Sequence, residues 1–297
     1  MGGLRVLQIY AQVGGAGNTM NRGERDELLV KLTLVYLKHQ GDGLHGVKCV
    51  TSVGDRSRVY RDWDPTFGNP RALTGLSDSQ LVSLARALDI KKTGAMEKAD
   101  VHINGAGFSL KSTRNSPPAI VNHTARPGWE FACGHARVSI APLDSAIASY
   151  WALRSSGQIM EDIGNDDPIS PFASLRSELA PVLTYFMFVG TGTKLSVAPA
   201  STVLEVGDAT DPTTWRAIDP ASVVGQVWGR LVFSLRSKKG MPLDYPRMKR
   251  LDAAAKLSVA KWTRFWKAQY RGALHVRVRP CKMGNTYVGA RSADAAS

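Results

Sequence analysis

Residues 99–112 read Ala-Asp-Val-His-Ile-Asn-Gly-Ala-Gly-Phe-Ser-Leu-Lys-Ser and have the pattern of a β-hairpin. Asn104-Gly105 lies between alternating apolar residues, and both residues tolerate the positive φ angles that a tight hairpin turn requires. We therefore expect one strand over Asp100–Ile103 and a second over Phe108–Lys111.

Three polar side chains come together if this hairpin forms. Side chains alternate along a strand, so Ser109 and Lys111 share one face, and Asp100 lies across the hairpin from this pair. A carboxylate beside a lysine on a rigid ribbon suits a metal ion and its bound water. The alternative is a surface ion pair between Asp100 and Lys111, which would contribute little to stability.

The clearest helix is predicted over Gly23–Gln40 and ends at Gly41. Asn21 is a good N-cap, and acidic residues occupy the first turns, where they interact favourably with the helix dipole. Glu24 and Glu27 are neighbours on the helix surface and both are candidate metal ligands. Glu24 has an alternative role, because it has capping-box spacing from Asn21. Glu27 could also be an ordinary solvated glutamate.

The remaining elements follow from turn residues and apolar periodicity. Further helices are expected over Asp78–Leu88, Ser145–Ser155, Leu175–Val189 and Leu251–Tyr270, and further strands over Val47–Val53, Arg58–Arg61, Ala119–Val121, Thr193–Pro199, Ser201–Val206, Val223–Leu235 and Leu274–Arg279. The fold class that we predict is α/β, with a central mixed β-sheet flanked by helices and a basic C-terminal α+β region.

The hairpin also resembles the core motif of the PD-(D/E)xK nucleases, in particular that of type II restriction endonucleases. The motif consists here of Asp100 and Ser109-Leu110-Lys111, with Ser where Glu or Asp is usual. The resemblance covers roughly residues 21–129, including the helix that begins at Asn21. It implies a restriction-endonuclease-like core, and some members with Ser at this position take a carboxylate from elsewhere in the fold.

The resemblance implies a role for each site residue. Asp100, the carbonyl of Leu110 and a helix carboxylate, Glu27 or Glu24, would hold Mg²⁺, which prefers oxygen ligands. Lys111 would position the attacking water, and Ser109 would form a hydrogen bond within the site. The residues that we expect to contact DNA are Ser112, Arg114, Asn122, His123, Lys256, Lys261 and Arg264. A structural role is the alternative for His123.

The charge distribution favours a polyanionic partner. The net charge of the chain is +13, and residues 230–282 alone hold 15 basic and two acidic residues, which equals the whole excess. Such a concentrated positive field attracts nucleic acid over a long range. The alternative is a solvated basic face on an ordinary protein.

We therefore expect a Mg²⁺-dependent, sequence-specific endonuclease for double-stranded DNA that acts as a homodimer. Residues 1–225 would form the nuclease core, 226–283 a basic DNA-contacting region and 284–297 a loose tail. A cognate DNA methyltransferase would belong to the same restriction system. No apolar run is long enough to span a membrane, and three distant cysteines suit a cytoplasmic protein. The alternatives are a non-catalytic nucleic-acid-binding protein and a repair or junction nuclease of the same fold.

Overall fold

The computed structural model describes residues 20–94, 96–114, 119–160, 163–238, 241–242 and 273–279. The chain forms two compact units, and each is built from two separate segments. The first unit comprises Met1–Ser116 and Val197–Asp219, and the second comprises Pro117–Ser196 and Pro220–Ser297. The predicted nuclease core and basic region are divisions by role and stay predictions.

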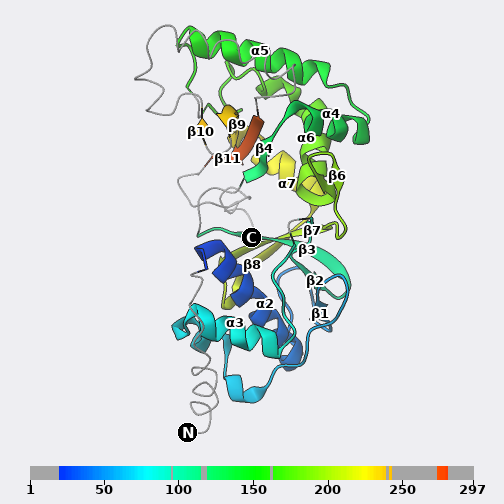
Figure 1. Ribbon diagram of the computed structural model, residues 1–297, viewed down its shortest axis with the longest axis vertical. Helices are drawn as coiled ribbons and strands as arrows, with labels where there is room; N and C mark the ends of the chain where they lie inside the picture. The colour runs from blue at the N-terminus through cyan, green and yellow to red at the C-terminus, as the bar shows by residue number, and fades with distance from the viewer. Residues whose placement is uncertain are drawn as a thin grey trace, which may run out of the picture. The chain divides into compact units, whose positions relative to one another are not determined.

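The first unit contains a mixed five-stranded sheet in the order β1-β2-β3-β7-β8 (Figure 1). Strand β3 pairs with β7 in parallel, and every other neighbouring pair is antiparallel. The strands are β1 (Val53–Gly54), β2 (Val101–Ile103), β3 (Ala106–Ser112), β7 (Thr202–Asp208) and β8 (Asp211–Ile218). Together with the flanking helices, this sheet confirms the predicted α/β class.

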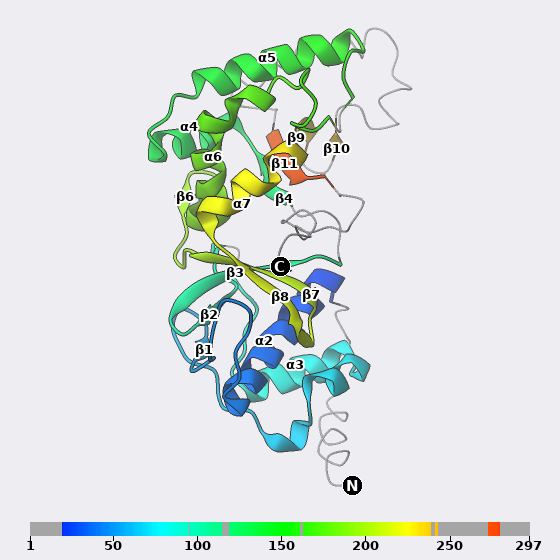
Figure 2. The same ribbon diagram turned by 180° about the vertical axis from the view of Figure 1, so that it is seen from behind.

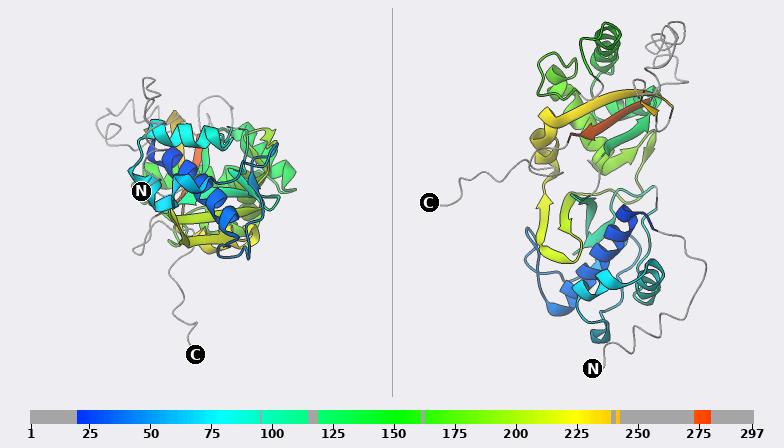
Figure 3. Two further views of the ribbon diagram at one scale, coloured as in Figure 1. Left: turned by 90° about the horizontal axis from the view of Figure 1, so that it is seen from below. Right: turned by 90° about the vertical axis from the view of Figure 1, so that its left-hand side faces the viewer.

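Two capped helices, α2 (Arg22–Gln40) and α3 (Asp78–Ala87), cover one side of this unit. Helix α2 packs against the sheet, and α3 packs against α2; the two helices lie side by side in Figure 3. Asn21 and Glu24 form the expected capping box at the start of α2, and Gly41 ends the helix in the left-handed conformation. These local predictions are confirmed because capping depends on residues that are adjacent in sequence.

The core of the first unit lies between these helices and the sheet, which Figures 1 and 2 show from opposite sides. Leu32 and Leu34 of α2 are fully buried there, and so are Val101 of β2 and Leu204 of β7. Burial of each such leucine stabilises the fold by about 1.5–3 kcal/mol relative to exposure. The core therefore fixes which sheet face carries Phe108 and Leu110 and which face carries Ser109 and Lys111.

The turn of the central hairpin has the predicted conformation. Asn104 and Gly105 have φ angles of 51° and 82° and connect β2 to β3. The side chain of Asn104 also accepts hydrogen bonds from the backbone N–H groups of Thr51 and Ser52. Thr51 and Ser52 thus bond to a turn side chain. The strands expected over Val47–Val53 and Arg58–Arg61 are shorter than predicted and are reduced to β1 and to a single bridge between Gly54 and Val59.

The second unit contains an antiparallel sheet in the order β10-β9-β11-β4. Its helices include the two predicted over Ser145–Ser155 and Leu175–Val189, the second of which ends in a π-helical turn. The elements are β4 (Ala119–Thr124), α4 (Arg126–His135), α5 (Ala141–Ser155), α6 (Arg176–Thr184), β5 (Gly190–Thr191), β6 (Lys194–Leu195), α7 (Pro220–Val227), β9 (Leu231–Lys238), β10 (Met241–Pro242) and β11 (Ala273–Val278).

Two strand predictions in the C-terminal half are wrong in part. The strand expected over Val223–Leu235 begins as helix α7, because Pro220 suits a first helical turn and Val223 and Val227 are buried on one helix face. Within Thr193–Pro199 only β6 is a strand, and it pairs with β5. The helix expected over Leu251–Tyr270 lies outside the described residues.

Gly105→Ala should lower the free energy of unfolding by about 1 kcal/mol, because alanine is strained at a φ of 82°. No heavy atom lies within 4 Å of a Cβ built at Gly105 or at Gly75, and Gly75 does not have a left-handed φ. Gly75→Ala is therefore the matched control and should leave stability unchanged or slightly raised. Equal effects of the two substitutions in urea unfolding would contradict this account of the turn.

Candidate active site

The hairpin brings Asp100, Ser109 and Lys111 together as predicted. The backbone N–H of Asp100 donates to the Phe108 carbonyl at 2.8 Å, and the pairing of Val101 with Phe108 places Asp100 next to Ser109. Oδ2 of Asp100 accepts hydrogen bonds from the Leu110 N–H at 2.6 Å and from Ser109 Oγ at 3.4 Å. The carboxylate therefore lies in the plane of the sheet, just before β2 begins, where β3 extends beyond its pairing with β2.

The carbonyl of Leu110 faces the same edge. Successive carbonyls along β3 point to opposite neighbours. The Gly107 carbonyl accepts from Ser201 on the β7 side, and the Phe108 carbonyl accepts from Asp100 on the β2 side. Leu110 is two residues after Phe108, so its backbone N–H and carbonyl point to the same side, and its N–H donates to Asp100. Its carbonyl is thus directed to the edge that the Asp100 carboxylate occupies.

The electrostatics of Asp100 are dominated by burial, which raises the pKa of its carboxyl group. The charge of Lys111 opposes this shift, and the carboxylate of Glu27 adds to it. A lysine and a second carboxylate thus act directly on Asp100. A cation at this carboxylate would lower its pKa again and favour the ionised form.

Helix α2 reaches the hairpin through a buried lysine. Lys31 is 1% exposed, and its ammonium group donates to Glu27 Oε1 at 2.6 Å, Thr93 Oγ1 at 2.9 Å and the Lys91 carbonyl at 3.0 Å. The Thr93 hydroxyl lies 2.8 Å from Glu27 Oε1 and 3.0 Å from the Asp100 carbonyl, and its single proton can go to one of them at a time. This network joins Glu27 to the residue that begins the hairpin.

Glu24 is the other candidate metal ligand on the helix, and it forms the capping box that was the alternative to metal binding. Its side chain accepts the Asn21 N–H and forms an ion pair with Lys92. These two hydrogen bonds, with Lys92 the larger contributor, lower the pKa of the Glu24 carboxyl group. Its role as a metal ligand stays a prediction.

The donor atoms at the hairpin fit a hard divalent cation. Oδ1 of Asp100 and Oε2 of Glu27 form no hydrogen bond with the described residues, and the Leu110 carbonyl faces Asp100. Within the same residues, no group of three or more His, Cys, Asp and Glu side chains is arranged to hold a metal. Two carboxylates remain sufficient for Mg²⁺, which usually keeps several waters and takes phosphate oxygens from its substrate.

The residues expected to contact DNA belong to different elements and to both units of the chain. Ser112 donates to Asp26 on α2 at 2.8 Å, and Arg114 forms an ion pair with Asp208 at the end of β7. Asn122 and His123 belong to β4 of the second unit. Lys256, Lys261 and Arg264 lie outside the described residues.

Glu205 and Lys98, two charged residues near the hairpin, were not identified from the sequence. Glu205 on β7 is the register partner of Lys111 in the parallel pair, so both side chains are on one sheet face, and Glu205 is 6% exposed. Lys98 has its pKa lowered to about 8, chiefly by burial and secondly by Lys111. Sequence spacing does signal Lys31, since it stands four residues after Glu27, but it gives no signal for Glu205.

Comparison with protein-family models, curated proteins and solved structures finds no significant match to this chain. Among the helices in the described part, none is long and apolar enough to cross a membrane.

Lys98→Met should change how stability depends on pH. In the wild type the charged form of Lys98 destabilises the fold fully below about pH 8. This effect disappears as the pH rises to 10.5, the ordinary lysine value, where the unfolded chain also loses the proton. Between pH 7 and pH 11 the wild type should therefore gain about 3 kcal/mol relative to the variant. Parallel stability curves in urea would refute the lowered pKa.

Lys31→Met should destabilise the protein by about 3 kcal/mol, because it leaves Glu27 and the Lys91 carbonyl without their shared donor. Adding Glu27→Leu should recover part of this loss, since the uncompensated carboxylate is then removed. A double-mutant cycle in urea unfolding measures both effects. A loss below about 0.5 kcal/mol, typical of an exposed pair, would contradict a buried network.

Proposed function

We propose that this protein is a Mg²⁺-dependent endonuclease that hydrolyses phosphodiester bonds of double-stranded DNA, with a restriction-endonuclease-like core of the PD-(D/E)xK type. The observation that carries the proposal is the placement of the Asp100 carboxylate, which accepts the Leu110 N–H and the Ser109 hydroxyl, while Thr93 contacts both the Asp100 carbonyl and the Glu27 carboxylate. A structural ion pair on an exposed hairpin would not need a helix carboxylate linked through Thr93 to a half-buried aspartate. A cation-binding site has reason to include such a link.

Asp100, Glu27 and the Leu110 carbonyl would hold the Mg²⁺ ion. When bound there, it would polarise a phosphoryl oxygen and lower the pKa of a coordinated water. The serine at position 109 supplies no carboxylate, and Glu27 from helix α2 takes that place. Its hydrogen bonds with Lys31 and Thr93 fix the direction of its carboxylate.

The chain's own residues would do the remaining work. Lys111 positions the attacking water and offsets the negative charge that develops on the phosphate. Ser109 donates to Asp100 and holds the carboxylate in the plane of the sheet. Leu110 donates to the same oxygen through its backbone, so Asp100 is fixed from two neighbouring residues.

The restriction role adds further proposals. The protein would be a cytoplasmic homodimer that cuts a palindromic duplex, because two-fold protein symmetry matches two-fold symmetry of the target. A DNA methyltransferase encoded next to it would favour restriction over a repair or junction nuclease. The basic C-terminal region, with its large positive charge, would strengthen binding to the DNA backbone.

Incubation with a long duplex DNA tests the nuclease directly. We expect discrete fragments with Mg²⁺, none with EDTA, and a loss of at least about 100-fold in rate for Lys111→Ala and for Asp100→Asn. Lys48→Ala, an exposed lysine of the same unit, is the control and should cut normally. DNA that is retarded but uncut in every lane would contradict the proposal and leave a non-catalytic nucleic-acid-binding protein.

A further inference from the structure

A cavity of about 610 Å³ lies beside Asp100 within the first unit. The turn at residues 55–58 and the segment at residues 91–94 contribute to its wall, and Asp100 itself lines it. The cavity thus begins at the proposed catalytic carboxylate and continues between two short backbone segments. It is large enough for a sugar-phosphate unit.

Two exposed cations on this wall have no carboxylate partner among the described residues. Arg58 pairs with Asp55 at 3.7 Å, and Lys92 pairs with Glu24. No ion pair involves Arg56 or Lys91 within the described part of the chain, and both side chains are exposed. Their charges are therefore available to an anion in the cavity.

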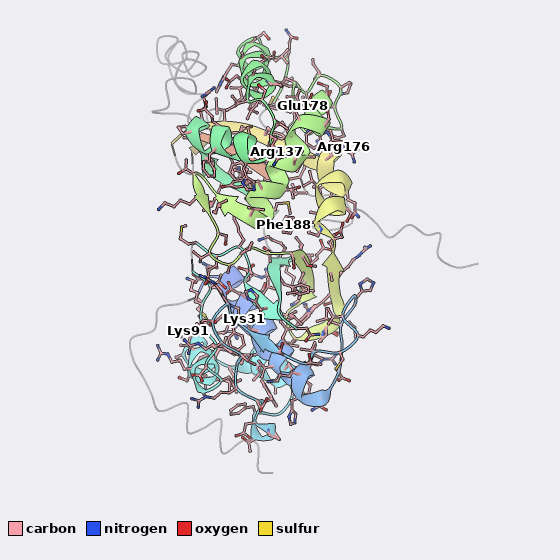
Figure 4. All side chains as sticks on the ribbon, turned by 90° about the vertical axis from the view of Figure 1, so that its right-hand side faces the viewer. Lys31, Lys91, Arg137, Arg176, Glu178 and Phe188 are labelled. Atoms are coloured by element: carbon pink, nitrogen blue, oxygen red, sulfur yellow. The ribbon has the colours of Figure 1, made fainter. Side chains whose placement is uncertain are left out.

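Hydrogen bonds fix the backbone segments that carry Arg56 and Lys91. Asp55 Oδ1 accepts from the Ser57 N–H, the Ser57 hydroxyl and the Arg58 N–H, which fixes the turn that carries Arg56. Lys31 donates to the Lys91 carbonyl at 3.0 Å and fixes the opposite segment (Figure 4). Backbone that is fixed in this way lowers the conformational cost of binding a ligand.

Tyr60 provides a hydrogen-bond donor in the same wall. It is 2% exposed, and its hydroxyl has no hydrogen-bond partner among the described residues. Burial raises the pKa of this hydroxyl, and the neighbouring carboxylates raise it further, so it keeps its proton. A buried donor without a partner costs about 1–3 kcal/mol, and an acceptor oxygen that enters the cavity would remove this cost.

We propose that this cavity binds a phosphodiester group of the DNA strand next to the bond cleaved at Asp100, with Arg56 and Lys91 as its cationic contacts and Tyr60 as a buried donor. The inference rests on the proposed function, because it assigns the cavity to the same substrate. Arginine and lysine side chains are the usual partners of backbone phosphates, and such contacts position the duplex without reading its sequence.

Duplex binding by the Lys111→Ala protein, which should leave DNA uncut, tests the inference at several salt concentrations. Adding Arg56→Ala and Lys91→Ala should raise the Kd at least about tenfold and lower the slope of log K against log salt by about 1–2. Arg61→Ala with Lys48→Ala also removes one arginine and one lysine charge, but outside the cavity wall, and should change the Kd less than about threefold. Tyr60→Phe should raise the Kd about threefold or more, since the phosphate loses a donor.

The outcomes separate this inference from the nuclease proposal. If the wild type cuts DNA but the cavity pair, added to Lys111→Ala, weakens binding no more than the control pair does, the inference fails and the nuclease stands. If the cavity pair weakens binding but the wild type never cuts DNA, the cavity still binds a backbone phosphate, whereas the nuclease proposal and the assignment to a cleaved bond fail. Inorganic phosphate that competes with duplex for the Lys111→Ala protein, but not for the protein that also carries Arg56→Ala and Lys91→Ala, supports the site. Equal competition in both overturns it, and thermal unfolding of each variant verifies that it is folded.

Discussion

The buried ammonium group of Lys31 is the interaction on which the first unit depends. A lysine that is 1% exposed must have its charge and its donors satisfied, and three acceptors do this: Glu27 one helical turn away, the Thr93 hydroxyl and the Lys91 carbonyl. Two of these acceptors belong to the segment that leads into the hairpin. A charge buried in a helix thereby determines where the hairpin begins and where its first carboxylate lies.

The sheet imposes the second constraint. Because β7 pairs with β3 in parallel, Glu205 comes to lie beside Lys111 on the face opposite the apolar core. Lys98 is half-buried, and its pKa responds to the charges of both Lys111 and Asp100. The site thus contains both lysines and carboxylates on the hairpin and β7. Removal of one of these charges would leave a neighbouring opposite charge uncompensated.

The features that could be predicted from the sequence are those with local causes. The hairpin follows from Asn104-Gly105, and the start of α2 follows from Asn21 and Glu24, all of which act on neighbouring residues. The completion of the sheet could not be predicted, because β7 comes about ninety residues after β3 and no periodicity indicates a pairing partner. The burial of Lys31 also depends on tertiary packing. Its spacing from Glu27 predicts an ion pair but not one removed from water.

Mn²⁺ binding measured by electron paramagnetic resonance tests the metal assignment most directly, since it reports the ion without requiring cleavage. We expect one bound Mn²⁺ per chain, with binding weakened about tenfold or more by Asp100→Asn and by Glu27→Gln. Glu24→Gln, on the same helix, should bind Mn²⁺ like the wild type because Glu24 is engaged with Asn21 and Lys92. Equal binding by all four proteins, or a loss only with Glu24→Gln, would contradict a site built from the hairpin and Glu27.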